Sequence, residues 1–206
     1  MFTPRLDRPA TLHDDNILWN LFRDGDEHAY TELARRYYRT LLTYGHRFTP
    51  NQQVVEDTLQ DLLIHLWLHR ESINDTPHVR FYLLKAFRHR MLKTIRPLAD
   101  VVEFTDEFDE HYAEFSKEDL LIQHENSEAL TMQVRNVMEQ LPVRQQEVIY
   151  LRFFQNLRTE EIASLLSINP QSVSNITQRA LSNLRKFWPS TSSISICFCW
   201  FSQIFA

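Results

Sequence analysis

Polar side chains between Gln171 and Arg179 are of the types that can read DNA bases. Amide and hydroxyl groups hydrogen-bond to base edges in the major groove, and basic groups contact phosphates. Between Gln171 and Trp188 there are three basic residues and no acidic residue, which favours contact with a phosphate backbone. The candidate DNA-binding residues in this segment are Gln171, Ser172, Ser174, Asn175, Gln178 and Arg179.

Two pairs of possible metal ligands carry a much weaker signal. His65 and His69 are four residues apart, but no Glu follows His65 and no third ligand is evident. Cys197 and Cys199 form a lone pair in an apolar stretch, where cysteines are more often inert. Nothing in the chain clusters as a nucleophile, a base and an orienting group. We therefore predict no catalytic residue, no metal, no cofactor and no small-molecule substrate, so the chain is not expected to be an enzyme.

The segment 159–179 has the residue spacing of a helix-turn-helix. Ala163 is the small residue at which two helices can cross closely, and Ser167 occupies the turn position, where glycine is commonest. The pair Asn169-Pro170 ends the first helix and begins the second. A solvated amphipathic helix is the alternative, but the spacing together with the polar side chains favours DNA binding. The apolar positions of the pattern are Ile162, Leu166, Ile168, Val173 and Ile176.

The N-terminal part of the chain is predicted to be one compact helical domain. Residues 12–48 have helical apolar spacing with a break near Gly25-Asp26, and two further helices cover residues 53–69 and 79–96. Between these two helices, residues 71–78 form a loop that contains turn-forming residues.

The predicted helix 53–69 has an unusual surface. The side opposite its core, which should be polar, carries one strip of Asp57, Asp61, Ile64 and Leu68, which we name the acidic-apolar strip. Apolar groups flanked by acids on an exposed face indicate a protein partner with basic and apolar groups. The alternative is that neighbouring helices of the same domain cover Ile64 and Leu68. The core face of this helix consists of Val55, Leu59, Leu62, Leu63, Leu66 and Trp67.

The predicted helix 79–96 is strongly basic, with six basic residues and no acidic residue. A basic surface interrupted by an aromatic ring suits a nucleic-acid strand, because the charges follow the phosphates and the ring can stack on an exposed base. A solvated basic face is the alternative. The core stripe is Leu83, Leu84, Phe87, Met91 and Ile95, and the opposite side carries Tyr82, Lys85, His89, Lys93 and Arg96.

Glycine is scarce and charge is unevenly distributed in this chain of 206 residues. Only Gly25 and Gly45 occur, which argues against phosphate-binding and dinucleotide-binding loops and favours helices over sheets. Residues 99–128 contain 11 acids and one base. Since the formal net charge of the whole chain is -5, that segment carries -10 and the rest of the chain +5. The overall charge therefore does not argue against nucleic-acid binding.

We predict an all-α fold of two small helical domains joined by an acidic linker, the second a four-helix domain with the helix-turn-helix. The predicted parts are an N-terminal domain over residues 12–97, a linker over 98–127, a C-terminal domain over 128–188 and an apolar tail over 189–206. The apolar stretch of the tail is too short to span a bilayer, and we predict no role for it. Two cysteines too close together to staple a fold, and an N-terminus without a secretory signal, indicate a cytoplasmic protein.

These segments resemble, in their order and spacing, the conserved domains of bacterial RNA polymerase sigma factors. The region 25–38, the run VEDTLQDLLIHLW at 55–67 and the run FYLLKAFR at 81–88 resemble the first of these domains. The runs LPVRQQEVIYLRF at 141–153, EEIA at 160–163 and RALSNLRK at 179–186 resemble the last. A form with only these two domains is that of the extracytoplasmic-function (ECF) branch of the sigma-70 family. The chain departs from the family at Asn156, where a glycine is usual, and at His89, where an asparagine is usual.

The resemblance implies a transcription initiation factor with one polymerase contact and two DNA contacts. It implies that the acidic-apolar strip (Asp57, Asp61, Ile64 and Leu68) binds the clamp coiled coil of the largest subunit of core RNA polymerase. The loop 71–78 and the helix after it would capture a flipped-out base of the promoter minus-ten element and hold the strand. The helix-turn-helix would read the minus-thirty-five element. The minus-ten residues implied in this way are Asn74, Asp75, His78, Arg80, Tyr82, Lys85, Arg88 and His89.

The partners implied by the resemblance are core RNA polymerase, promoter DNA and an anti-sigma factor. It also implies that the linker 98–127 threads the RNA-exit region of the polymerase, although a solubilising linker fits the composition equally. The alternative function is that of a helix-turn-helix regulator that binds operators without core polymerase. Such a regulator normally dimerises and carries a sensor domain, and the N-terminal domain shows neither a heptad seam nor a ligand-pocket signature.

Overall fold

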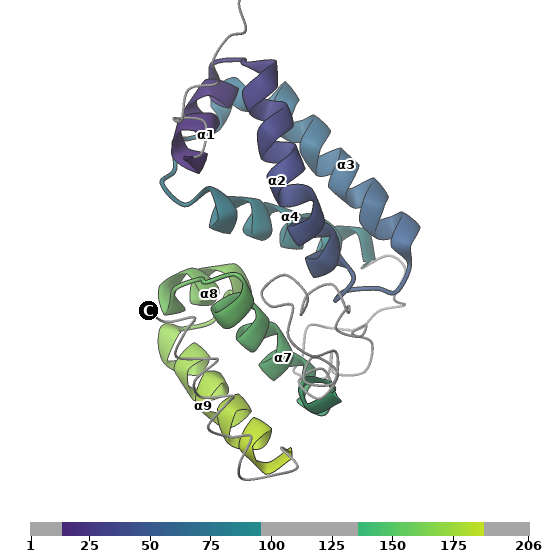
Figure 1. Cartoon of the computed structure of the whole chain (residues 1–206), viewed down its shortest axis with the longest axis vertical. Coiled ribbons are helices and arrows are strands. Elements are labelled where there is room, and N and C mark those ends of the chain that lie inside the picture. The colour runs from purple at the N-terminus through teal and green to yellow at the C-terminus, as the bar shows by residue number, and fades with distance from the viewer. Residues whose placement is uncertain (1–13, 96–135, 188–206) are drawn as a thin grey trace, which may run out of the picture. The chain divides into compact units, whose positions relative to one another are not determined.

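Residues 14–95 and 136–187 are described by the computed structural model of the chain, and the regular elements in these two ranges are all helices (Figure 1). They fall into two compact units, the first holding helices α1 to α4 and the second holding α7 to α9. The prediction of an all-α fold with two small helical domains is therefore confirmed. The predicted linker (98–127) and apolar tail (189–206) lie outside the described residues, as do Arg96, Cys197 and Cys199.

The described part of the first unit contains four α-helices and one short 3-10 helix. The predicted break lies between the first two helices, where Gly25 has a φ of 94° that L-residues rarely adopt. The predicted helices 53–69 and 79–96 agree with α3 and α4 to within one residue at each end. The elements are α1 (Asp15–Arg23), α2 (Glu27–Gly45), α3 (Gln52–Leu68), η2 (Arg70–Ser72) and α4 (Val79–Ile95).

The segment that follows α3 differs from the prediction in one respect. Residues 71 and 72 were expected in a loop, but they belong to η2. The His69 carbonyl accepts hydrogen bonds from the backbone N–H of Ser72 at 2.9 Å and from its hydroxyl at 2.8 Å. These two bonds close a helical turn, so the open loop begins only at Ile73.

The helices of the first unit enclose one apolar core. Both α1 and α3 pack on α2, and α4 crosses α2 and α3 (Figure 1). Gly45, at the end of α2, permits this close packing, because a Cβ atom there would lie 2.3 Å from Cγ1 of Val55. The largest fully buried side chains of the core include Leu18, Trp19, Phe22, Leu41, Leu59, Leu62, Leu84, Phe87 and Met91.

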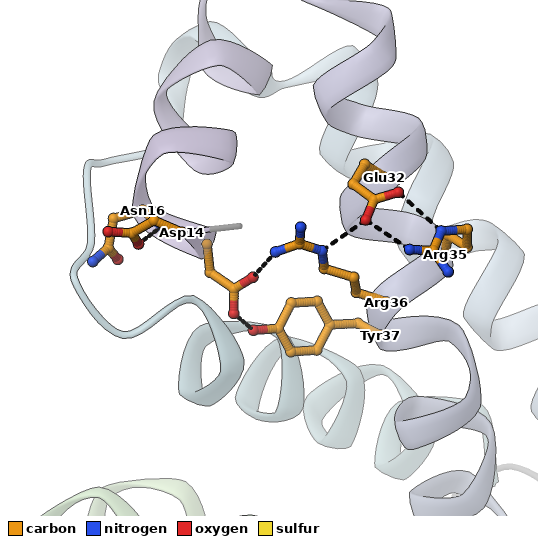
Figure 2. A network of polar contacts seen from close by, with 7 residues as sticks. Asp14, Asn16, Glu32, Arg35, Arg36 and Tyr37 are labelled. Atoms are coloured by element: carbon orange, nitrogen blue, oxygen red, sulfur yellow. Dashed lines mark hydrogen bonds and ion pairs between the residues drawn. The ribbon is translucent and has the colours of Figure 1, made fainter. Parts of the chain in front are cut away.

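A polar network joins the start of α1 to α2 (Figure 2). The Asp15 carboxylate pairs with Nη1 of Arg36 at 2.9 Å and accepts a hydrogen bond from the Tyr37 hydroxyl. Arg36 also pairs with Glu32 at 2.8 Å, and Arg35 pairs with the same carboxylate at 2.7 Å. Burial, followed by the bond to Asp15, raises the pKa of Tyr37, so its hydroxyl stays a hydrogen-bond donor at neutral pH. These contacts fix α1 on α2.

The described part of the second unit contains four helical segments, as predicted. One covers residues 136–139, and α7 continues directly into η3, a π-helical turn. No helix within residues 14–95 or 136–187 has the length and apolar character needed to cross a bilayer. The named elements are α7 (Val143–Ile149), η3 (Tyr150–Phe154), α8 (Thr159–Leu166) and α9 (Pro170–Phe187). Their shared core includes Ile149, Tyr150, Leu151, Ile162, Val173 and Ala180.

The helices α8 and α9 form the predicted helix-turn-helix. Ser167 follows α8 in the left-handed region, with a φ of 56°, which explains why glycine is commonest at this position. The Asn169 side chain accepts a 2.7 Å hydrogen bond from the backbone N–H of Ser172, and α9 begins at Pro170. Of the predicted apolar positions, Ile162, Ala163, Leu166 and Val173 are buried, while Ile168 and Ile176 are half-buried.

Candidate functional site

The acidic-apolar strip lies on the exposed side of α3. Ile64 is 55% exposed and Leu68 is 67% exposed, and Asp57 and Asp61 are exposed beside them. Neighbouring helices therefore do not cover the two apolar side chains, and the alternative reading of this strip is wrong. Apolar side chains this exposed on a well-packed helix mark a surface suited to a partner.

The opposite side of α3 is held firmly in the first unit. Val55, Leu59, Leu62 and Leu66 are buried as predicted, and Leu63 and Trp67 are half-buried. The Tyr30 hydroxyl donates a 3.0 Å hydrogen bond to the Leu63 carbonyl, and its ring lies 5.0 Å from that of Trp67. The Arg70 guanidinium lies 4.6 Å from the centre of the Trp67 ring and donates to the Trp67 carbonyl at 2.8 Å. These contacts fix the position of α3 in the first unit, and with it the position of the acidic-apolar strip.

The loop that precedes α4 and the first eleven residues of α4 carry the candidate minus-ten residues. Most of them are exposed, while Tyr82 and Arg88 are half-buried. The Tyr82 ring meets the Trp19 ring of α1 edge-on at 5.1 Å, and burial raises the pKa of Tyr82. Part of this ring is therefore used in packing, a role that the sequence did not indicate. The exposed members are Asn74, Asp75, His78, Arg80, Lys85 and His89.

The start of this loop is bonded to α1, a relationship that sequence reasoning missed. Nε of Arg23 donates a 2.7 Å hydrogen bond to the Ile73 carbonyl, and Nε1 of Trp19 donates a 3.3 Å bond to the Asn74 carbonyl. The partners are 50 and 55 positions apart in the chain, and no spacing rule connects residues at such separations.

The candidate base-reading residues lie on the outer side of α9. Gln171, Asn175 and Gln178 recur at helical spacing and are exposed, and Arg179 is exposed beside them. Nε2 of Gln171 donates a 3.1 Å bond to the Asn175 side chain, which orders two of these amides. The remaining candidates, Ser172 and Ser174, are half-buried. Short polar groups on the exposed face of a helix of this kind can reach base edges in a major groove.

The histidine pair at the C-terminal end of α3 does not form a metal site with other described residues. The rings of His65 and His69 lie 4.0 Å apart between centroids, and Nδ1 of His69 is 2.9 Å from the His65 carbonyl. Burial, then the nearby Arg90 and His69, lower the pKa of His65. In the ranges that the structure describes, no three His, Cys, Asp or Glu side chains are grouped to hold a metal ion.

Comparison with known protein families shows that segments of both units match regions of one family. The model of sigma-70 region 2 matches residues 33–99, and the model of sigma-70 region 4 matches residues 131–184. The chain belongs to the sigma-70 family. Because both regions match in the predicted order, a helix-turn-helix regulator that lacks sigma-70 region 2 does not account for the chain. As a sigma factor, the protein directs promoter-specific initiation of transcription by RNA polymerase.

Named relatives agree with this assignment. The RNA polymerase sigma factor SigZ of Bacillus subtilis is 24% identical over 161 residues, 75% of this chain and 84% of that protein. The ECF RNA polymerase sigma factor SigX of the same species is 25% identical over 166 residues, 78% of this chain and 84% of that protein. The prediction of an ECF sigma factor is therefore confirmed.

One solved structure with the same fold is the sigma factor RpoE of Bartonella quintana, crystallised with the anti-sigma factor NepR. It has a TM-score of 0.51 and 16% sequence identity to this chain, and the match covers 77% of this chain and 95% of that one. At this level of identity the likeness concerns the fold.

Proposed function

We propose that this sigma factor has three binding surfaces, one that binds core RNA polymerase and two that bind promoter DNA. The observation that carries the polymerase contact is the exposure of Ile64 and Leu68 next to the exposed Asp57 and Asp61, on a helix whose other side is buried. The partner that fits this strip is a basic and apolar helical surface, such as the clamp coiled coil of the largest polymerase subunit. Asp57 and Asp61 would then pair with basic groups of that subunit.

The second surface is the loop 73–78 with the exposed side of α4, and it serves the minus-ten element. Unstacking a base costs about a few kcal/mol, which is recovered when the flipped base is bound. Asn74, Asp75 and His78 are exposed on the loop and can hydrogen-bond to such a base. Arg80, Lys85 and His89 are exposed along α4, and with the half-buried Arg88 and Tyr82 they would hold the separated strand.

The third surface is the outer side of α9, which serves the minus-thirty-five element. Gln171, Asn175, Gln178 and Arg179 present donors and acceptors to base edges, and Ser172 and Ser174 add half-buried hydroxyl groups in the first turns of the helix. In this proposal the polymerase supplies the chemistry of nucleotide addition, and the sigma factor itself catalyses nothing.

The proposal extends to the other predicted parts and partners. The domains 12–97 and 128–188 are joined by the linker 98–127, and the protein acts in the cytoplasm with core polymerase and promoter DNA. An anti-sigma factor is a further proposed partner, and the complex of RpoE with NepR supports this proposal by analogy.

Co-purification and run-off transcription with core RNA polymerase test the proposed function. The wild-type chain should bind core enzyme and direct transcription from specific start sites in a genomic library. Asp61→Arg reverses the charge at the centre of the strip and should abolish core binding while the helical content stays unchanged. The matched control is Glu27→Arg, the same charge change at an exposed position of α2. Unchanged core binding by Asp61→Arg would contradict the polymerase contact, and an absence of start-site selection by the wild type would contradict the function.

A further inference from the structure

The helix α1 lies before residues 33–99, the part of the chain that matches sigma-70 region 2, yet it contacts the loop assigned to the minus-ten element. Nε of Arg23 donates to the Ile73 carbonyl at 2.7 Å, and Nε1 of Trp19 donates to the Asn74 carbonyl at 3.3 Å. Two consecutive carbonyl groups at the start of the loop are thus bonded to side chains of one helix. Both donors are fixed N–H groups on planar systems, which restricts the direction of each bond.

The two donors are themselves held in place. Trp19 is 1% exposed and lies in the core, and its ring contacts the rings of Phe22 at 5.3 Å and Tyr82 at 5.1 Å. Nη1 of Arg23 donates to the Asn20 side chain at 3.3 Å. At the other end of α1, Asp15 binds the side chains of Arg36 and Tyr37 of α2. The helix therefore acts as a rigid support for the loop.

The orientation of the loop follows from these bonds. Because the carbonyls of Ile73 and Asn74 point toward α1, and Ile73 is buried, the Asn74 and Asp75 side chains are left exposed. On the far side of the loop, the contact between Trp19 and Tyr82 fixes the first turn of α4. One helix thus sets the position of both ends of the segment that carries Asn74, Asp75 and His78.

We propose that Arg23 and Trp19 are positioning residues that set how well this loop discriminates between bases in the minus-ten strand. This inference rests on the proposed role of the loop in capturing an unpaired base. A loop with an ordered backbone loses less conformational freedom when the base binds, and its polar side chains stay at fixed distances from the base edge. If the two bonds are removed, the loop can still meet the strand, but its hydrogen-bonding groups are no longer aligned with one base.

Strand binding by the full-length sigma factor in complex with core RNA polymerase tests the inference. The probes are short non-template strands from a promoter that the wild-type holoenzyme transcribes, with each minus-ten position in turn made abasic. The ratio of the affinities for the intact and the abasic strand measures base discrimination at that position. The variants are Arg23→Met, which removes the donor but keeps the apolar stem, and Trp19→Phe, which keeps a ring against Tyr82 but has no N–H. Arg23→Lys keeps a donor, and Asn16→Ala is a control at an exposed position of α1.

The wild type and Asn16→Ala should show a position of strong discrimination. Arg23→Met and Trp19→Phe should lower the ratio at that position by about fivefold, which corresponds to about 1 kcal/mol, while core binding and the affinity for the abasic strand stay unchanged. Arg23→Lys should retain most of the ratio. A purely structural role would instead lower core binding and both strand affinities together.

The results that would overturn the inference are distinct from those that would overturn the proposed function. If the wild type discriminates and both Arg23→Met and Trp19→Phe keep the full ratio, or lose both strand affinities equally, the positioning role is wrong. If the wild-type complex discriminates at no minus-ten position, the role of the loop is wrong and the inference fails with it.

Discussion

Nη1 of Arg144 lies 3.0 Å from the carboxylate of Glu147, whose side chain is only 3% exposed. The same guanidinium donates a 3.3 Å hydrogen bond from Nη2 to the carbonyl of Leu166, the last residue of α8. One arginine of α7 therefore pairs with a buried acid and also bonds to the end of the first helix of the helix-turn-helix. A buried carboxylate that loses a charged partner is costly, because water cannot replace that partner.

Arg144→Met should destabilise the second unit by about 1–3 kcal/mol. Because Arg144 is itself about one-third exposed, water screens part of the interaction and the loss stays well below that of a fully buried pair. The free energy of unfolding in urea measures the effect, and hydrogen exchange of amides in α7 and α8 locates it. The control Arg179→Met, at an exposed position of α9, should change stability by less than about 0.5 kcal/mol. Equal effects of the two substitutions would show that the Arg144 contacts add nothing.

The Glu32 carboxylate, in the polar network between α1 and α2, makes the stability of the protein depend on pH. Hydrogen bonds from Arg35 and Arg36 lower the pKa of Glu32 from 4.5 to about 2. Since the folded-state pKa lies below the unfolded one, the Glu32 contacts stabilise the protein fully above pH 4.5, and this contribution is lost as the pH falls toward about 2. Glu32→Gln should therefore be less stable than the wild type at neutral pH, and the difference should shrink between these two values.

Urea unfolding at a series of pH values, with an NMR titration of the Glu32 carboxyl group, checks this prediction. Glu56→Gln is the matched control, because the hydrogen bond that Glu56 accepts from the Gln52 side chain can also be accepted by an amide. A Glu32 carboxyl group that titrates at its ordinary value, or a stability difference that is independent of pH, would contradict it.

The fold and the exposed surfaces were predictable wherever a short-range rule applies. Helical periodicity placed Leu59 and Leu62 inside and Ile64 and Leu68 outside, because each residue turns about 100° around the helix axis. Gly25 marked the break between the first two helices, and it has the positive φ expected of a glycine at such a turn. These features depend on neighbours within about one or two helical turns.

The relationships between distant residues could not be predicted in the same way. The bonds from Arg23 and Trp19 to the loop join partners at least 50 positions apart, and Tyr82 is half-buried because it packs on Trp19. The sequence presents Tyr82 simply as an aromatic residue on a basic helix. The direction of its ring depends on where α1 lies, and that depends on the packing of the whole unit.

At two positions the chain carries another residue where a glycine is usual, and the backbone conformation there explains the preference for glycine. Asn156 has a φ of 53° and Ser167 a φ of 56°, so both residues adopt the left-handed conformation that favours glycine. Ser167→Gly should therefore stabilise the second unit, by up to about 1 kcal/mol, because an L-residue pays a steric cost there. Asn156→Gly should give a smaller gain, since asparagine tolerates this conformation better than serine.

Thermal unfolding of the two single variants measures these gains. Ser164→Gly is the control, because position 164 lies within α8, where a glycine should destabilise the helix by about 0.5–1 kcal/mol. The ranking Ser167→Gly above Asn156→Gly above Ser164→Gly is expected. A loss of stability in Ser167→Gly would mean that the serine side chain makes a contribution larger than its backbone cost.

The outer side of α9 offers the sharpest test of sequence recognition. Gln178 lies in line with Gln171 and Asn175, and Arg179 lies about 100° further around the helix. Gln178→Ala or Arg179→Ala should weaken recognition of the native minus-thirty-five element by about 1–3 kcal/mol for each base-edge pair that is lost.

Holoenzyme binding is compared on the native promoter and on one with a scrambled upstream element, and Gln140→Ala, at an exposed glutamine of the same unit, is the control. A variant that loses the same affinity on both promoters has lost only a phosphate contact, and for Arg179→Ala, which removes a charge, the slope of log K against log[salt] should then fall by about one unit. If both variants behave in this way, α9 holds the DNA at these positions without reading its bases.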